Sequence, residues 1–84
     1  MTEKAIVIGS NSFSGASFIR HSLKQGLQVI GMSRSKESND AFLPYKWIRK
    51  GDFQFHQLDL NHDLNKIMET IKSEKPDYII NFAA

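Results

Sequence analysis

AIVIGSNSFSG, residues 5–15, is the stretch of the sequence that decides the fold. Its first four residues are a continuous apolar run rich in β-branched side chains, which is typical of a strand buried on both faces of a parallel sheet. Small polar residues follow, and from about Ser14 to Gln25 the apolar side chains Ala16, Ile19 and Leu23 fall on one helical face. The stretch therefore predicts a strand, a tight turn and a helix in immediate succession.

Strand and helix patterns alternate through the rest of the chain. We expect strands at 28–32, 53–57 and 78–82, since the first and last are apolar runs and 53–57 alternates with period two. Gly26 is a natural terminator of the first helix. Asn61 is the expected N-cap of a second helix. That helix carries its apolar stripe on Leu64, Ile67, Met68 and Ile71.

Strands that alternate with helices predict a parallel sheet with right-handed crossovers. Four such strands lie in the order 3-2-1-4 in a doubly wound sheet. We therefore expect residues 1–84 to form part of one α/β domain, a partial Rossmann fold without its C-terminal half. The fourth strand would lie at the edge although its sequence is that of an interior strand, and an apolar edge invites pairing. We expect further chain, or another polypeptide, to cover that edge.

Composition excludes several classes of function. The chain has 84 residues and a formal net charge of +2 with its basic residues scattered, so we expect no nucleic-acid partner. It contains no cysteine, which excludes disulfides and thiolate metal sites. It lacks the pattern of a signal peptide and has no apolar stretch long enough for a membrane span. A cytoplasmic protein with no membrane partner is the expectation.

The loop after the first strand has the residue types that hold a phosphate. Gly9 suits the sharp turn on leaving the strand, and Gly15 would let the helix pack close to the sheet. Between them, the backbone at Ser12 and Phe13 would approach a diphosphate, at which the helix directs free N–H groups and its dipole. An ordinary turn that uses glycine for a positive φ is the alternative. The preceding strand and the following helix favour the phosphate site.

This loop resembles the G-x-x-G-x-x-G loop of the extended short-chain dehydrogenases/reductases of the NDP-sugar epimerase/dehydratase group. Phe13 and Gly15 match the family's pattern, whereas Ser12 replaces its middle glycine and must adopt an acceptable backbone conformation. The resemblance implies that the loop binds the phosphates of a nicotinamide dinucleotide. The residues to which it assigns this role are Gly9, Asn11, Ser12, Phe13, Ser14 and Gly15.

Two later segments resemble the same family in the same order. Residues 58–60, Leu-Asp-Leu, are similar to the Asp-Leu after the family's third strand, which implies that Asp59, with Leu60 beside it, contacts the adenine amino group. Residues 78–84 resemble the strand ending that lines the cofactor's ribose. That likeness implies contacts from Phe82, Ala83 and Ala84.

The end of the second strand, within residues 29–35, resembles the segment that selects NAD or NADP. An acidic residue there would bind the ribose hydroxyls of NAD. Ser33 and Arg34 stand there instead, and a guanidinium pairs bidentately with a 2′-phosphate. GDP-mannose 4,6-dehydratases, which use NADP, have a similar arginine-serine ending. Arg34 as a solvated loop charge and Glu37 as a ribose contact for NAD stay open, and we favour NADP over NAD.

The family's reaction uses a Tyr-x-x-x-Lys pair, which this chain lacks. Arg49 follows Tyr45 at that spacing and Phe82 follows Tyr78, so we assign no catalytic residue. The resemblance thus implies the cofactor-binding portion of an NAD(P)-dependent nucleotide-sugar epimerase, dehydratase or reductase that is inactive by itself. The nucleotide sugar would bind only when the rest of the enzyme is present, and the complete protein could form a homodimer.

Two other functions stay open. One is a non-enzymatic dinucleotide-binding module with a regulatory or interaction role. The other is a flavodoxin-like α/β domain with no dinucleotide.

Three further groups of residues are assigned structural roles. The histidines are too dispersed for a metal site or for catalysis. Asp63, four residues after Asp59, favours the helix N-terminus through the dipole. The aromatic cluster near Pro44 is expected to pack within the long connection between the second and third strands. The histidines are His21, His56 and His62, and the aromatic cluster consists of Phe42, Tyr45 and Trp47.

Overall fold

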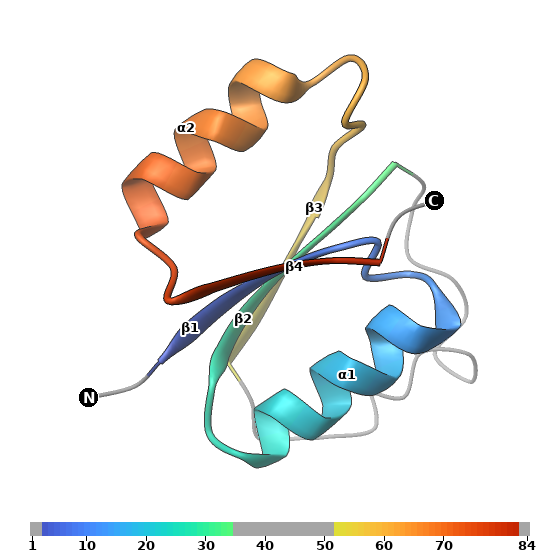
Figure 1. The fold of residues 1–84 in the computed structure, drawn as a ribbon, viewed down its shortest axis with the longest axis vertical. Helices are drawn as coiled ribbons and strands as arrows, with labels where there is room; N and C mark the ends of the chain where they lie inside the picture. Colours follow the sequence, from blue (N-terminus) through green and yellow to red (C-terminus); the bar gives the residue numbers. More distant parts are fainter. Residues whose placement is uncertain (1–2, 35–51, 83–84) are drawn as a thin grey trace.

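The computed structural model describes residues 3–34 and 52–82. The elements follow one another along the chain as shown in Figure 1. They are β1 (Lys4–Ile8), α1 (Phe13–Lys24), β2 (Gln28–Ser33), β3 (Asp52–Gln57), α2 (Leu64–Glu74) and β4 (Tyr78–Asn81). The four strands form one parallel sheet in the order β3-β2-β1-β4. The predicted fold class and strand order are confirmed.

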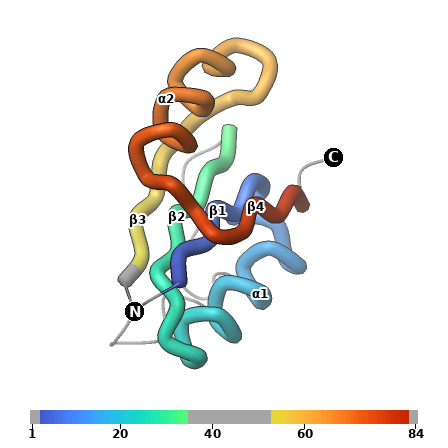
Figure 2. Tube along the Cα trace, turned by 60° about the vertical axis from the view of Figure 1, so that its left-hand side comes forward, coloured from blue at the N-terminus to red at the C-terminus, as the bar shows by residue number. Residues whose placement is uncertain are grey.

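The two helices cover opposite faces of the sheet (Figures 1 and 2). Successive residues of a strand point to opposite faces, so β1 contributes to two cores. Val7 packs on the α1 side with Ala16 and Ile19. Ile6 packs on the α2 side with Ile67. Because β1 is covered on both faces, its central residues are fully buried, as the apolar run predicts.

Helix α1 begins one residue earlier than its apolar pattern suggests. Its N-cap is Ser12, whose hydroxyl oxygen accepts the N–H of Gly15. At the other end, Gln25 is the C-cap and Gly26 follows with a φ of +87°. This left-handed conformation favours glycine, which confirms the predicted terminator.

The N-cap predicted for α2 is wrong. The helix starts at Leu64 with Asp63 as its N-cap, and no side-chain hydrogen bond caps it. The N–H of Asn61 instead donates to Oδ1 of Asp59, at 2.8 Å. A carboxylate that accepts the N–H two residues on builds a turn of its own, so the chain turns once before the helix begins.

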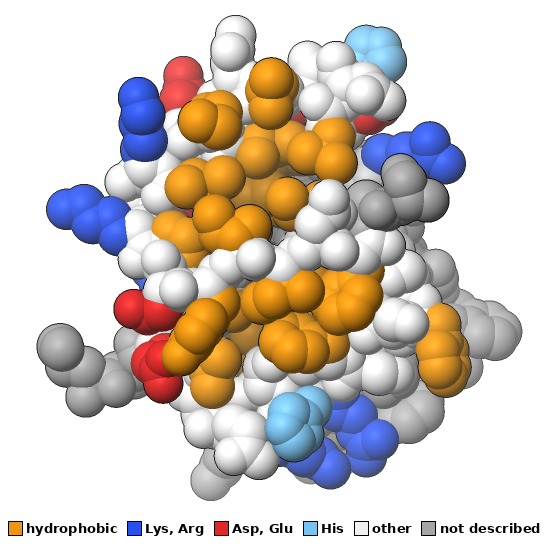
Figure 3. Space-filling model, viewed as in Figure 1, with side chains coloured by type: hydrophobic (Ala, Val, Ile, Leu, Met, Phe, Trp, Pro, Cys, Tyr) orange, Lys and Arg blue, Asp and Glu red, His pale blue; other side chains and the backbone are white. Residues whose placement is uncertain are grey.

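Strand β4 lies at the edge of the sheet, next to β1. Tyr78 is 48% exposed and Ile79 is 50% exposed, whereas the central residues of β1 are buried. Figure 3 shows apolar side chains gathered on the face across which β4 runs in Figure 1. The predicted edge position is confirmed, and the covering of that edge stays a prediction.

Several sequence predictions lie outside the described residues. They are those on Glu37, on the aromatic cluster Phe42, Tyr45 and Trp47, and on Ala83 and Ala84. Within the described part of the chain, neither helix is long and apolar enough to cross a membrane.

Candidate functional site

A cavity of about 410 Å³ opens at the carboxyl ends of the strands. Segments from all four strand ends line it: the start of the β1–α1 loop, the end of β2, the turn after β3 and Phe82 after β4. The chain runs from β1 outward to β3 and then returns to place β4 on the other side of β1. Ligands of open α/β sheets bind at such a switch point, outside the carboxyl ends of the strands.

Most of the residues selected from the sequence meet at this cavity. Eight of them line it: Gly9, Asn11, Ser12, Ser33, Arg34, Asp59, Leu60 and Phe82. Phe13 and Ser14 are exposed outside it, and residue Phe13 as a whole is 83% exposed. Gly15 is buried beneath the loop. Ile8, Leu58 and Asn61 also line the cavity, although the sequence analysis assigned none of them to the cofactor site.

Close backbone packing shapes the β1–α1 loop. Gly9 has a φ of +84°, a conformation that favours glycine, and its N–H donates to the carbonyl oxygen of Met32 at 2.7 Å. A Cβ atom on Gly15 would lie only 2.3 Å from the carbonyl oxygen of Gly9. The first turn of α1 therefore touches the backbone that leaves β1, and only glycine fits at position 15.

Ser12 replaces a glycine of the family pattern without backbone strain. Its φ of −71° and ψ of 157° are extended values that any residue adopts. The hydroxyl donates to the carbonyl oxygen of Gly9 at 2.8 Å and accepts the N–H of Gly15 at 3.0 Å. The hydroxyl proton of Ser12 is therefore already engaged in holding the loop.

The start of α1 presents backbone donors. The N–H of Gly15 is bonded to Ser12 Oγ, and that of Ala16 to the Ser12 carbonyl. Among the hydrogen bonds of the described residues, none takes up the N–H of Phe13 or Ser14. The first N–H groups of a helix lack acceptors within the helix and carry its positive dipole end. The loop can therefore hold an anion through its backbone.

A contact with β2 fixes the depth of the loop, and the sequence reasoning missed it. Ser10 is fully buried. A Cβ atom on Gly31 would lie 2.8 Å from Cβ of Ser10 and 2.9 Å from Cζ of Phe53. The signal was available, because a glycine inside a strand marks the close approach of another group. Gly31 leaves the space in which the loop residue after Gly9 packs.

The turn after β3 forms the opposite wall of the cavity. Its leucines pack toward the core on the α2 side, with Leu58 and Leu60 beside Ile8. Asp59 accepts the N–H of Asn61, and its own N–H donates to Oδ2 of Asp63 at 2.9 Å. The hydrogen bond from the Asn61 N–H, helped by His62, holds the pKa of the Asp59 carboxyl below its usual range. An ionised carboxylate on an apolar wall is a hydrogen-bond acceptor for a base.

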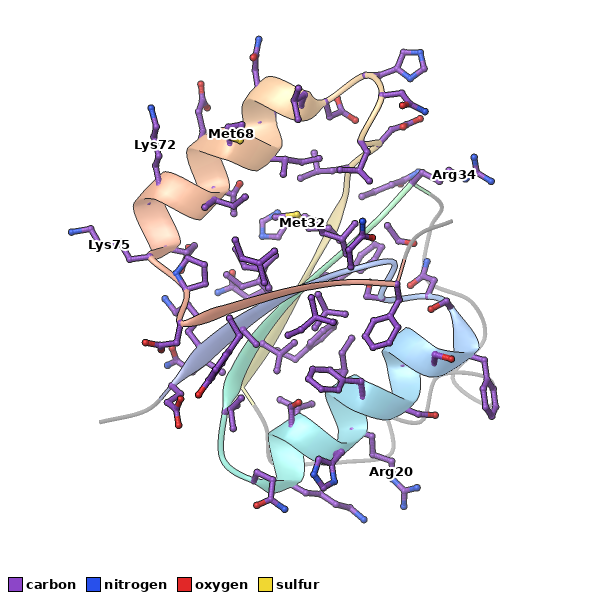
Figure 4. The ribbon with its side chains drawn as sticks, in the orientation of Figure 1. Arg20, Met32, Arg34, Met68, Lys72 and Lys75 are labelled. Atoms are coloured by element: carbon purple, nitrogen blue, oxygen red, sulfur yellow. The ribbon has the colours of Figure 1, made fainter. Side chains whose placement is uncertain are left out.

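Arg34 stands at the end of β2, where the side-chain view places it beside the turn after β3 (Figure 4). Its side chain is exposed, and its carbonyl oxygen accepts Nε2 of Gln57 at 3.2 Å. The N–H of Leu58 donates to the carbonyl oxygen of Ser33 at 2.9 Å. These two bonds tie the ends of β2 and β3 together, so Arg34 is held at the rim of the cavity. Its charge also contributes to lowering the pKa of Asp59.

The sequence profile of the NAD-dependent epimerase/dehydratase family matches residues 5–84. The chain belongs to this family. The match includes the loop, the turn after β3 and the strands on which the cavity is built. No curated protein sequence matches the chain significantly.

Solved structures give the same fold. The dTDP-glucose 4,6-dehydratase of Bacillus anthracis, in complex with NAD, aligns with a TM-score of 0.79 at 21% identity, over 99% of this chain and 27% of the dehydratase. Epimerase Mth375 of Methanothermobacter thermautotrophicus aligns with a TM-score of 0.77 at 20% identity, over 99% of this chain and 23% of the epimerase. A 4-hydroxyisoleucine dehydrogenase complexed with NADH aligns with a TM-score of 0.73 at 23% identity, over 99% of this chain and 34% of the dehydrogenase.

This family member thus has the Rossmann-like fold of much longer proteins. The chain spans between 23% and 34% of the length of the three structures.

Proposed function

We propose that this chain is the cofactor-binding part of an NAD(P)-dependent epimerase, dehydratase or reductase that acts on a nucleotide sugar. One observation carries the proposal. The β1–α1 loop and the ionised Asp59 lie on two walls of a single cavity at the switch point of the sheet. A dinucleotide has an anionic diphosphate and an adenine with a donor amino group, which fit these two walls.

Each wall would hold one part of the dinucleotide. The diphosphate would accept hydrogen bonds from the N–H groups at the start of α1 (Phe13–Lys24), where the dipole favours an anion. The adenine would pack against Leu58 and Leu60 and donate its amino group to Asp59. Phe82, with Ala83 and Ala84 after it, would line the cofactor's ribose.

The cofactor would supply hydride transfer, and this part of the protein would supply binding and orientation. The chain has no Tyr-x-x-x-Lys pair at either tyrosine. We therefore expect the isolated chain to bind the dinucleotide without turning over a nucleotide sugar.

NADP is the favoured cofactor. Arg34 lies at the cavity rim with Ser33, at the strand end where the adenosine ribose would lie. A guanidinium pairs well with a 2′-phosphate, and the tether from Gln57 holds the Arg34 backbone in place.

Calorimetric titration of the chain with NADPH, NADH and FMN tests the proposal. We expect both dinucleotides to bind and FMN not to bind. Binding of FMN alone would point to a flavodoxin-like domain, and binding of none of the three would contradict the proposal.

Replacement of Arg34 by alanine tests the cofactor preference. We expect the affinity for NADPH to fall about tenfold, because a charge-assisted hydrogen bond is lost, and that for NADH to change little. Lys72→Ala is the matched control, since it removes one positive charge from α2, away from the cavity (Figure 4). Equal losses of NADPH and NADH affinity in Arg34→Ala would remove the NADP preference and leave the dinucleotide site.

A further inference from the structure

Asp59 has a neighbour that the role proposed for it does not use. Nδ1 of His62 lies 3.2 Å from Oδ2 of Asp59. The His62 side chain is 81% exposed and does not line the cavity, whereas Asp59 does. The imidazole therefore contacts the carboxylate from outside the cavity lining.

The two oxygens of this carboxylate have different partners. Oδ1 accepts the backbone N–H of Asn61 at 2.8 Å, a bond that fixes the turn and does not change with pH. Among the hydrogen bonds and ion pairs of the described residues, Oδ2 is contacted by the His62 ring nitrogen alone. Because an ionised carboxylate has lone pairs for more than one donor, an adenine amino group could share Oδ2 with the imidazole.

Other charged groups near the pair are few within the described residues. Arg34 approaches from the end of β2 and favours the ionised form of Asp59. Asp63, before α2, is engaged with the backbone N–H of Asp59. The lining residues from the β1–α1 loop and from the end of β4 are uncharged. Of the two side chains, the imidazole of His62 is the type that can change charge near neutral pH.

We propose that His62 positions the Asp59 carboxylate for the adenine amino group, and that protonation of His62 weakens adenine binding. The inference rests on the proposed function of the cavity. Neutral His62 donates one hydrogen bond to Oδ2 and holds the carboxylate toward the cavity. Protonated His62 forms an ion pair with Oδ2 of Asp59. This ion pair partly neutralises the carboxylate that would accept the hydrogen bond from the adenine amino group.

The direction of the effect follows from the two groups. The lowered pKa of Asp59 keeps its carboxylate ionised from pH 8.0 to about pH 5.5, so the charge of Asp59 itself does not change in this range. As the pH falls, the fraction of imidazolium rises and the affinity for adenine falls. Because exposed ion pairs are weak, we expect the dissociation constant to rise about two- to fivefold.

The experiment compares NAD⁺ with nicotinamide hypoxanthine dinucleotide, by calorimetric titration of the whole chain between pH 8.0 and 5.5. The two ligands differ only in the base, since hypoxanthine has a carbonyl oxygen where adenine has the amino group. Their diphosphates do not titrate in this range, unlike the 2′-phosphate of NADP. We expect the affinity for NAD⁺ to fall two- to fivefold with pH and that for the hypoxanthine analogue not to fall.

Two variants assign the effect to His62. Glutamine at position 62 can donate the same neutral hydrogen bond but cannot be protonated, so His62→Gln should retain the NAD⁺ affinity measured at pH 8.0 and lose its pH dependence. His56→Gln, on β3 and away from the cavity lining, is the matched control and should keep the pH dependence.

The outcomes separate the two proposals. A pH-independent NAD⁺ affinity, a parallel change for the hypoxanthine analogue, or a pH dependence that survives in His62→Gln would overturn the role of His62 and leave the dinucleotide site. If neither dinucleotide binds at pH 8.0, the proposed function fails and the role of His62 fails with it.

Discussion

The two turns that wall the cavity are built by opposite means. Residues 9–12 turn because side chains are missing: glycine at 9 gives the positive φ, and glycine at 15 admits the Gly9 carbonyl oxygen. Residues 59–63 turn because carboxylates are present: Asp59 and Asp63 each accept a backbone N–H. The first turn begins a helix that a serine caps, whereas the second precedes a helix with no side-chain cap.

The difference matches the two ends of the ligand that we propose. A turn made of small residues brings backbone N–H groups close to an anion and adds no negative charge. A turn made of carboxylates would repel a diphosphate, but it can accept hydrogen bonds from a base. A substitution in the first turn should therefore affect binding of the diphosphate, and a substitution in the second turn should affect binding of the adenine.

The largest expected effect is that of Gly15→Ala. The new Cβ atom would meet backbone at 2.3 Å, so α1 must move away from the loop. We expect stability to fall by about 1–3 kcal/mol, as overpacking typically does, and dinucleotide affinity to fall with it. Leucine at the same position should have a larger effect. Urea unfolding and titration with NADPH provide the two measurements.

Gly26→Ala is the control for Gly15→Ala. It introduces the same methyl group at a positive φ, at the far end of α1, where nothing lies within 4 Å. It should lower stability through strain but leave the affinity of the folded protein unchanged. Full affinity in Gly15→Ala would contradict the assignment of the loop.

Ser12 should show an intermediate effect. Ser12→Ala removes the N-cap of α1 and should lower stability by about 1 kcal/mol, whereas Ser12→Gly should lower stability by only roughly a few tenths of a kcal/mol. Because the hydroxyl proton is engaged with Gly9, both variants should retain dinucleotide affinity once folded. A large loss of affinity at unchanged stability in either variant would mean that the hydroxyl itself contacts the ligand.

The smallest effect is expected at Asp63. Asp63→Ala removes the acceptor for the N–H of Asp59 and should lower stability by about 0.5 kcal/mol, because the site is only partly buried. Asp63→Asn retains an acceptor oxygen, so its stability should be closer to that of the parent protein. Thermal unfolding of the two variants measures the difference, and equal stabilities would show that this hydrogen bond does not hold the turn.

Much of the site could be predicted because its residues are close together along the chain. The loop from Gly9 to Gly15 lies between a strand and a helix whose patterns are local, and parallel strands bring their carboxyl ends to one edge. The same local reasoning was wrong at Asn61. Its amide side chain is a good N-cap, but the neighbouring Asp59 takes its N–H and moves the helix start to Leu64.

The sequence by itself determined the alternation of strands and helices, the parallel sheet and the two segments that face the cavity, because hydrophobic period and glycine position are properties of neighbouring residues. Only the tertiary structure decided how deep the loop sits and what holds it. Ser10 packs against Gly31, and the Gly9 N–H donates to Met32. These contacts join residues about twenty positions apart, and their distances depend on how two strands align across the sheet.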